Sequence, residues 1–431
     1  MHLGERIPGG RVALGAEAAR GALSVFAELY LSRGRRDRPP AKPDQRAVIE
    51  LMFDRARAQA TTAPVRFVFD AFSTFRKLRA VDPRSIERSG GMYAGMVGPL
   101  SFSGLSFSFA QRFLALAEPL VRREDVTERF LFELMRFVHG HVAGEWDDAG
   151  EIERAAVDET LRLGVIWDVT NYLGLLAERR LLQGRFADAR ALIAELAKIA
   201  ELYQYDLARS THRGLEAFLR LEEGHAREAL RAAELYYTEH QEPMFNLLAL
   251  GAKAKAELLL GELAAAAETL ARGEVILGDA GIMPPYHASS LWRSRLLFDL
   301  AELEGAQAQG EAKLARRAAK AARGSAKQAL ATAAKAALRR PEVWRLEGRR
   351  RWLGGDRKGG LAWLRRSLAE AERLGMAPER ARTLAELAGR LADPAAPLRE
   401  VEGRDALQCL SEAESAFSKL EIEFDLGEPR P

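Results

Sequence analysis

Apolar residues recur every three or four positions through almost the whole chain, with charged and small residues between them. In one example, Leu173, Ala177 and Leu181 lead up to Gly184, and the same spacing resumes at Ala189. Strong helix formers dominate these segments and runs of β-branched residues are scarce. The pattern predicts an all-α chain of about eighteen to twenty helices with no sheet.

Glycines punctuate the helical pattern at regular intervals. Five of them have a small residue five positions later: Gly144, Gly184, Gly224, Gly261 and Gly355. The first four are 40, 40 and 37 residues apart. Glycine accepts the left-handed backbone that closes a helix, and a fixed period of this length is typical of stacked helix hairpins. The sequence therefore predicts a right-handed α-solenoid of stacked antiparallel helix pairs, with these glycines in the turns.

A gap of 94 residues separates Gly261 from Gly355. Within it, residues 311–340 are rich in alanine and lysine, and Gly324-Ser325 predicts a break between two helices. We expect the array to lose its regularity in this gap. Any specialised feature of the solenoid is expected there.

Residues 98–109 read GPLSFSGLSFSF, an alternation that resembles a strand. An isolated strand would leave its edge unpaired. We therefore predict a turn at Gly98-Pro99, a break near Gly104 and a helix through Phe113. Near the other end, a last helix is predicted from about Gly403 to Leu420.

These observations divide the chain into five segments. They are an irregular helical part at 1–130, regular repeats at 131–282, irregular helices with the basic segment at 283–340, further repeats at 341–422, and a frayed tail at 423–431.

Composition and charge narrow the class of protein. Apolar residues make up 48% and charged residues 29%, which is typical of a globular chain. The net charge of +3 is too even to indicate nucleic acid as the main partner. The single cysteine, Cys409, is predicted in the core and fits a reducing cytoplasm. No signal-peptide or membrane-spanning apolar run occurs, so no membrane insertion is expected.

One segment is specific enough to suggest a family. Its key positions are Trp344, Gly348, Gly355, Gly360, Leu364 and Ser367. These spacings resemble the tetratricopeptide repeat, although Glu347 and Arg351 stand where that repeat prefers apolar or aromatic residues. The periods of 37 to 40 residues also exceed the usual one of about 34, so longer helices or turns are expected. Residues 130–391 thus resemble a degenerate tetratricopeptide array.

The chain also resembles the C-terminal helical region of large bacterial multidomain signalling proteins of the kinase, ATPase and cyclase type. An irregular N-terminal part followed by turns such as GEWDDA, GRFADA and GHAREA carries this likeness. What it implies is a sensing or docking segment, without chemistry of its own.

Motifs for catalysis are missing from the sequence. It has no phosphate-binding GxxxxGK[ST] loop, no HExxH and no Cys/His cluster, and the glycine-rich run 354–360 fits a helix turn better than a phosphate site. His139 and His141 project about 200° apart on a helix. A metal site combining either histidine with Asp148 is the alternative to a plain turn. We predict no enzyme, no cofactor and no catalytic or metal-binding residue.

Positive charge is concentrated in residues 313–366. Four of its cations follow three- and four-residue steps and share a helix face: Arg316, Lys320, Arg323 and Lys327. The sequence favours a solvated face whose charge is balanced by acids elsewhere in the fold. Contact with phosphates or an acidic partner is the alternative.

The leading hypothesis is a noncatalytic scaffold that binds a protein or peptide partner on its concave face. The candidate contacts are Arg179, Arg180, Arg213, Arg220, Tyr236 and Tyr237. Binding of nucleic acid or an anionic surface by residues 313–366 and sensing of a small ligand or peptide are the alternatives. Because the chain opens on an apolar helix around Val25, Phe26 and Leu29, we expect a partner or an upstream domain to cover that end.

Overall fold

The computed structural model describes residues 20–21, 23–26, 38–59, 64–238, 242–280 and 283–422. Within them the chain forms twenty α-helices, which confirms the predicted all-α helical repeat array. The predictions for Leu29 and for the tail 423–431 fall outside the described residues.

The described residues form two compact units. The first runs up to Gly140 and also includes Asp147–Val169, and the second comprises His141–Trp146 and the residues from Thr170 onward. The predicted boundaries at 282 and 340 therefore lie inside the second unit.

The first unit contains shorter, irregular helices: α2 (Pro43–Gln59), α3 (Pro64–Leu78), α4 (Ser89–Gly95), α5 (Val97–Ser103), α6 (Phe107–Ala117) and α9 (Arg154–Arg162), with 3₁₀ turns at Pro83–Ser85 and Glu118–Leu120. Three helices are divided between the units: α7 (Val126–Ala143), α8 (Trp146–Ala149) and α10 (Ile166–Gln183). Phe75, Tyr93 and Phe113 form the aromatic centre of the first unit, with Phe75 5.5 Å from Tyr93 and 5.1 Å from Phe113 between ring centroids. Edge-to-face contacts of this kind add to the hydrophobic gain of burial.

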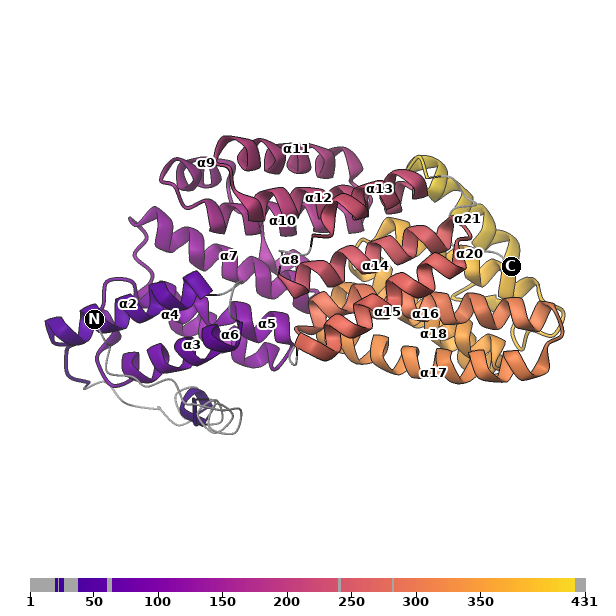
Figure 1. Ribbon diagram of the computed structural model, residues 1–431, viewed down its shortest axis with the longest axis horizontal. Coiled ribbons are helices and arrows are strands. Elements are labelled where there is room, and N and C mark those ends of the chain that lie inside the picture. Colours follow the sequence, from indigo (N-terminus) through magenta and orange to yellow (C-terminus); the bar gives the residue numbers. More distant parts are fainter. Residues whose placement is uncertain are drawn as a thin grey trace. The chain divides into compact units, whose positions relative to one another are not determined.

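The second unit is built from helix pairs. Its remaining elements are α11 (Phe186–Leu202), α12 (Asp206–Glu223), α13 (Ala226–Tyr236), α14 (Pro243–Leu259), α15 (Leu263–Ala280), α16 (Pro285–Ala308), α17 (Ala312–Lys335), the 3₁₀ turn η3 (Ala337–Arg339), α18 (Arg340–Leu353), α19 (Arg357–Arg373), α20 (Ala377–Ala392), β1 (Glu400–Val401), β2 (Arg404–Asp405) and α21 (Ala406–Lys419). In Figure 1 the elements are coloured in sequence order, from indigo at the N-terminus to yellow at the C-terminus.

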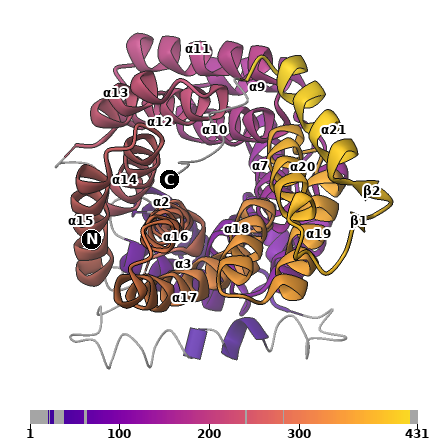
Figure 2. The same ribbon diagram turned by 90° about the vertical axis from the view of Figure 1, so that its right-hand side faces the viewer.

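Viewed end-on, the pairs of the second unit surround a common axis (Figure 2). The first helices of successive pairs, α12, α14, α16, α18 and α20, form the inner layer. The second helices, α11, α13, α15, α17, α19 and α21, form the outer layer. Each outer helix therefore buries one face against its neighbours and leaves the other face to solvent.

All five glycines of the sequence pattern occupy left-handed turns. Their φ angles are 77° at Gly144, 77° at Gly184, 86° at Gly224, 76° at Gly261 and 87° at Gly355. The prediction that these residues mark turns is confirmed. A side chain at such a φ would clash with its own backbone, which is why glycine is used.

The gap between Gly261 and Gly355 contains α15, the long pair of α16 and α17, η3 and α18. Both α16 and α17 have 24 residues, and the turn between them contains Gly310 with a φ of 71°. The pairing of helices continues through this gap, with longer helices than in the other pairs. The sequence analysis missed this turn although a small residue, Ala315, follows Gly310 by five positions.

The array of the second unit closes on itself. Arg382 on α20 donates to Glu222 on α12 across 2.6 Å. A Cβ atom added at Gly184 would lie 2.6 Å from Leu420 and 3.2 Å from Pro378, so the first turn touches the last helix pair directly. Arg373 also donates to the carbonyl oxygen of Gly144 at 2.8 Å. The two ends of the array are thus in contact.

Three local predictions need correction. Gly98 and Pro99 lie inside α5 and do not form a turn, because proline is tolerated in the first turn of a helix. The predicted break at Gly104 and the helix that follows it are confirmed. Gly324-Ser325 does not interrupt α17, and β1 and β2 form a small antiparallel hairpin where no sheet was expected.

Candidate functional site

Two regions of the second unit collect charged side chains in different ways. One lies between the inner helices and the other along the exposed face of α17. They include most of the basic residues that the sequence grouped together in 313–366.

Glu178 of α10 is a buried carboxylate with three hydrogen-bond partners. It accepts hydrogen bonds from Tyr286 of α16 and from Arg339 of η3, and His141 lies 2.8 Å away through its Nε2 atom. The side chain is buried, and burial alone would raise its pKa. The charge of Arg339 and these hydrogen bonds outweigh burial and hold the pKa of Glu178 well below its usual range. Glu178 is therefore ionised, and it joins three separate segments.

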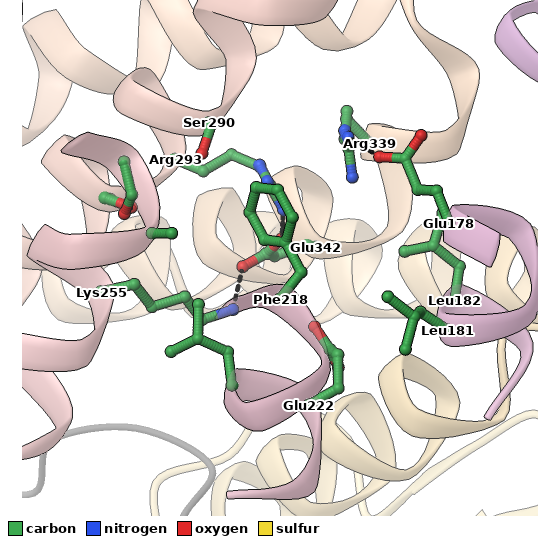
Figure 3. Close-up of a pocket in the computed structure, with 14 residues that line it drawn as sticks. Glu178, Leu181, Leu182, Phe218, Glu222, Lys255, Ser290, Arg293, Arg339 and Glu342 are labelled. Atoms are coloured by element: carbon green, nitrogen blue, oxygen red, sulfur yellow. Dashed lines mark hydrogen bonds and ion pairs between the residues drawn. The ribbon is translucent and has the colours of Figure 1, made fainter. Parts of the chain in front are cut away.

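Glu342 of α18 forms a second centre. Lys255 of α14 lies 2.9 Å from its Oε1 atom, and Arg293 of α16 donates to its Oε2 atom. The pKa of Glu342 lies well below its usual value: burial opposes ionisation, and the charges of Arg293 and Lys255 outweigh it. Figure 3 shows this carboxylate between its two cations, opposite the pair of Glu178 and Arg339.

Further pairs continue along the inner layer. Arg345 of α18 donates to Glu379 of α20 at 2.6 Å, and both side chains are buried. Arg349 of the same helix donates to Glu304 of α16 at 2.5 Å. We call the pairs centred on Glu178, Glu222, Glu304, Glu342 and Glu379 the inner ion-pair network.

A pocket opens among these residues. It is lined by Glu178, Leu181, Leu182, Phe218, Leu221, Glu222, Gly251, Ala252, Lys255, Ser290, Arg293, Ser294, Arg339 and Glu342. Its three carboxylates face three cations, and each carboxylate already bonds a cation of the protein. Because buried charges are stable only when paired, this arrangement holds helices together and keeps few groups for a ligand.

The outer face of α17 carries cations that form no ion pair with the described part of the chain. We call the outer basic stripe the seven exposed residues Lys313, Arg316, Arg317, Lys320, Arg323, Lys327 and Lys335. Among the described residues no carboxylate forms an ion pair with any of them. The opposite face of the helix, with Ala322, Ala326 and Ala329, is buried against the hydrophobic core that it shares with α16. Acids that balance this face through direct ion pairs are therefore not found in this part of the chain.

The other half of the basic stretch behaves differently. Arg350 and Arg351 both pair with Glu347 at 2.7 Å, which explains why a carboxylate stands at that repeat position. On α19, Arg365 lies 3.7 Å from Glu402, and Arg366 lies over the ring of Trp363 at 5.0 Å. These arginines are engaged within the protein.

The candidate partner contacts lie in varied surroundings. Arg179 is buried over the ring of Trp146, Arg180 is buried and donates to Gln183, and Tyr236 is buried in the core. Burial speaks against these three as contacts on a free surface. The other three are partly exposed and also engaged: Arg213 with the Leu235 carbonyl, Arg220 with Glu216 and Glu223, and Tyr237 with Arg272.

The histidine and cysteine positions can now be placed. His139 lies 3.4 Å from the hydroxyl of Ser101, while His141 bonds Glu178 and Asp148 is exposed. The described residues hold no group of three His, Cys, Asp or Glu side chains placed for a metal ion.

Cys409 is fully buried, as predicted for a core residue, and burial raises the pKa of its thiol. In the glycine-rich run, Asp356 caps α19 by accepting from the Gly359 amide.

No protein-family model matches the chain, and no curated protein matches it. Across the described residues, none of the helices combines the length and apolar content required to cross a bilayer.

Sequence reasoning missed the inner ion-pair network. Its partners lie far apart along the chain, for example 161 residues between Glu178 and Arg339. A weak signal was present in α18, where Glu342, Arg345 and Arg349 follow three- and four-residue steps beside apolar core positions. Charged residues on the core side of a helix require partners from neighbouring helices.

Proposed function

We propose that this chain is a noncatalytic interaction scaffold that binds a protein partner, or a segment of one, on the outer helices of its second unit. The observation that supports this is the inner ion-pair network, in which the inner helices use their charged side chains on one another. A peptide entering between those helices would have to break buried pairs, at a cost of about 3–5 kcal/mol each. The outer helices offer their free faces without that cost.

The setting follows from the resemblance to bacterial signalling proteins with tetratricopeptide-like arrays. In that setting the scaffold docks or senses a component of a signalling or assembly complex. A reducing cytoplasm is part of this proposal, since a single buried thiol such as Cys409 forms no intrachain disulfide.

Cross-linking of the full chain in its native cell extract tests the proposal. A lysine-reactive cross-linker can reach the exposed Lys198 of α11 and Lys358 of α19, whereas Lys255 of α14 is engaged with Glu342. We expect cross-links to partner proteins at the outer lysines and none at Lys255, identified by mass spectrometry. Partner cross-links at Lys255, or turnover of a substrate by the purified chain, would contradict the proposal.

A further inference from the structure

We propose that the outer basic stripe of α17 binds an acidic polypeptide segment, rich in Asp and Glu, that lies along the helix. This inference rests on the proposed function and deepens it, because it assigns one outer helix and the chemistry of the partner. It starts from seven exposed cations on one helix that have no ion-pair partner among the described residues.

The stripe has the dimensions of a linear site. From Lys313 to Lys335 it is about 33 Å long, at about 1.5 Å per residue. An extended segment of about ten residues covers that length, at about 3.3 Å per residue. Lys313, Lys320 and Lys327 are seven residues apart, two helical turns each, so cations recur along one line. Carboxylates spaced along an extended or helical segment can meet them in register.

The charges of the stripe are held close together by the fold. Cations three and four residues apart on one helix face repel each other, at a cost of a few tenths of a kcal/mol for each pair. Elsewhere in this unit arginines are paired with carboxylates, as Arg185 is with Asp188 or Arg390 with Glu386 on other helices. An acidic partner removes the repulsion in the stripe and gains attraction in its place.

The neighbouring helices limit the width of the positive surface. α15 and α17 both pack against α16 (Figure 2). α15 carries the exposed carboxylates Glu268, Glu274 and Asp279. On α19, Arg365 and Arg366 are engaged with Glu402 and Trp363. The unbalanced charge is therefore a band about one helix wide, which suits a single polypeptide segment.

Other anionic partners fit this band less well. Single-stranded nucleic acid is usually held by aromatic side chains on which its bases stack, and α17 has none. A duplex or a membrane surface is wider than one helix and would also meet the carboxylates of α15. Stable membrane binding adds apolar side chains to the charge, and along this face only Leu314 is large and exposed.

The test measures binding of a fluorescein-labelled peptide of about twelve residues, alternating Glu and Gly, to the full chain by anisotropy. We expect binding that weakens steeply between about 50 and 200 mM salt. The variant with Arg316→Glu, Lys320→Glu and Arg323→Glu should bind about tenfold or more weakly, because like charges now face the peptide. The neutral variant with Ala at the same three positions should lie between it and the wild type.

A matched control changes the net charge by the same amount elsewhere. Lys198→Glu, Arg227→Glu and Arg231→Glu alter three exposed cations of α11 and α13 and should leave peptide affinity unchanged. Circular dichroism melting verifies that all three variants are folded. If the charge-reversed variant does not fold, the neutral variant with Ala at the same positions provides the comparison with the wild type.

Three outcomes would overturn the inference. They are no binding of the peptide, equal weakening by the control variant, and tighter stripe-dependent binding of a duplex of about 20 base pairs or of phosphatidylserine vesicles than of the peptide. If partner cross-links at Lys198 and Lys358 persist in the reversed variant while the peptide fails to bind, the scaffold function stands and the stripe assignment falls.

Discussion

The inner ion-pair network and the outer basic stripe contain the same types of cationic residue, but these residues have different roles in the two regions. Arg345 on α18 is buried against Glu379, whereas Arg316 on α17 is exposed and has no carboxylate partner among the described residues. The two arginines belong to adjacent helices of one short stretch of sequence. Which helix face a cation occupies, and which layer that helix joins, decides between a structural role and a surface role.

The comparison also separates what each region contributes to stability. A buried charge without its partner is costly, while an exposed one is nearly neutral. Substitutions in the inner network should therefore change folding, and substitutions in the stripe should change association.

The largest effect is expected from Glu178→Ala. This change leaves Arg339 buried without its carboxylate and removes the acceptor of Tyr286 and the partner of His141. We expect the free energy of unfolding to fall by about 3–5 kcal/mol in urea denaturation. The matched control is Glu228→Ala, whose exposed pair with Arg231 measures 3.5 Å and whose loss should cost less than about 1 kcal/mol. Equal losses in both variants would remove the distinction between the two regions.

Lowering the pH should reduce the contribution of the inner ion-pair network to the free energy of unfolding. The pKa of Glu342 is lowered in the folded state, so its contribution is present above the unfolded value of 4.5 and is lost as the pH falls through the folded value. The difference in unfolding free energy between wild type and Glu342→Gln should shrink by about 1.4 kcal/mol per pH unit below about pH 4.5. Urea titrations from pH 7 to pH 3 measure this, and a difference that stays constant would contradict it.

The closure of the array can be tested at its first turn. Gly184→Ala should cost about 1–2 kcal/mol for the left-handed backbone, plus a further amount because the new Cβ meets Leu420 and Pro378. The matched control is Gly261→Ala. Gly261 has the same left-handed backbone, but no atom lies within 4 Å of a Cβ added there. If thermal melting shows equal losses for the two variants, the contact between the ends of the array contributes nothing.

The smallest effect on folding is expected in the outer basic stripe. Arg316→Ala, Lys320→Ala and Arg323→Ala together should shift the unfolding free energy by less than about 0.5 kcal/mol per site, since none of the three has an ion pair in the described structure. Urea denaturation at low salt provides the measurement. A loss comparable to that of Glu178→Ala would mean that the stripe is structural.

Much of the fold was predictable because it depends on local chemistry. The 3.6-residue period identified the helices, and the left-handed preference of glycine located five turns. Gly310 was missed although Ala315 follows it by five positions, so the pair of α16 and α17 was not recognised in the sequence. The turn predicted at Pro99 was wrong because proline interrupts a helix only in its interior and is tolerated in the first turn, where Pro99 lies.

The candidate sites were predictable only in part. Periodicity placed Arg316, Lys320, Arg323 and Lys327 on one face, and the structure agrees that they are exposed together. The same periodicity could not show that Arg179 and Tyr236 are buried, because burial depends on neighbouring helices.

By itself, the sequence determined the helices, the positions of most turns and the presence of a basic stretch, since these depend on residues a few positions apart. The tertiary structure decided which of the charges are paired, because partners such as Arg382 and Glu222 meet only when the array closes across 160 residues. Coulomb attraction and desolvation act through space and not along the chain. For that reason one basic stretch was divided between two regions, a buried network that joins helices of the array and an exposed stripe without ion pairs in the described chain.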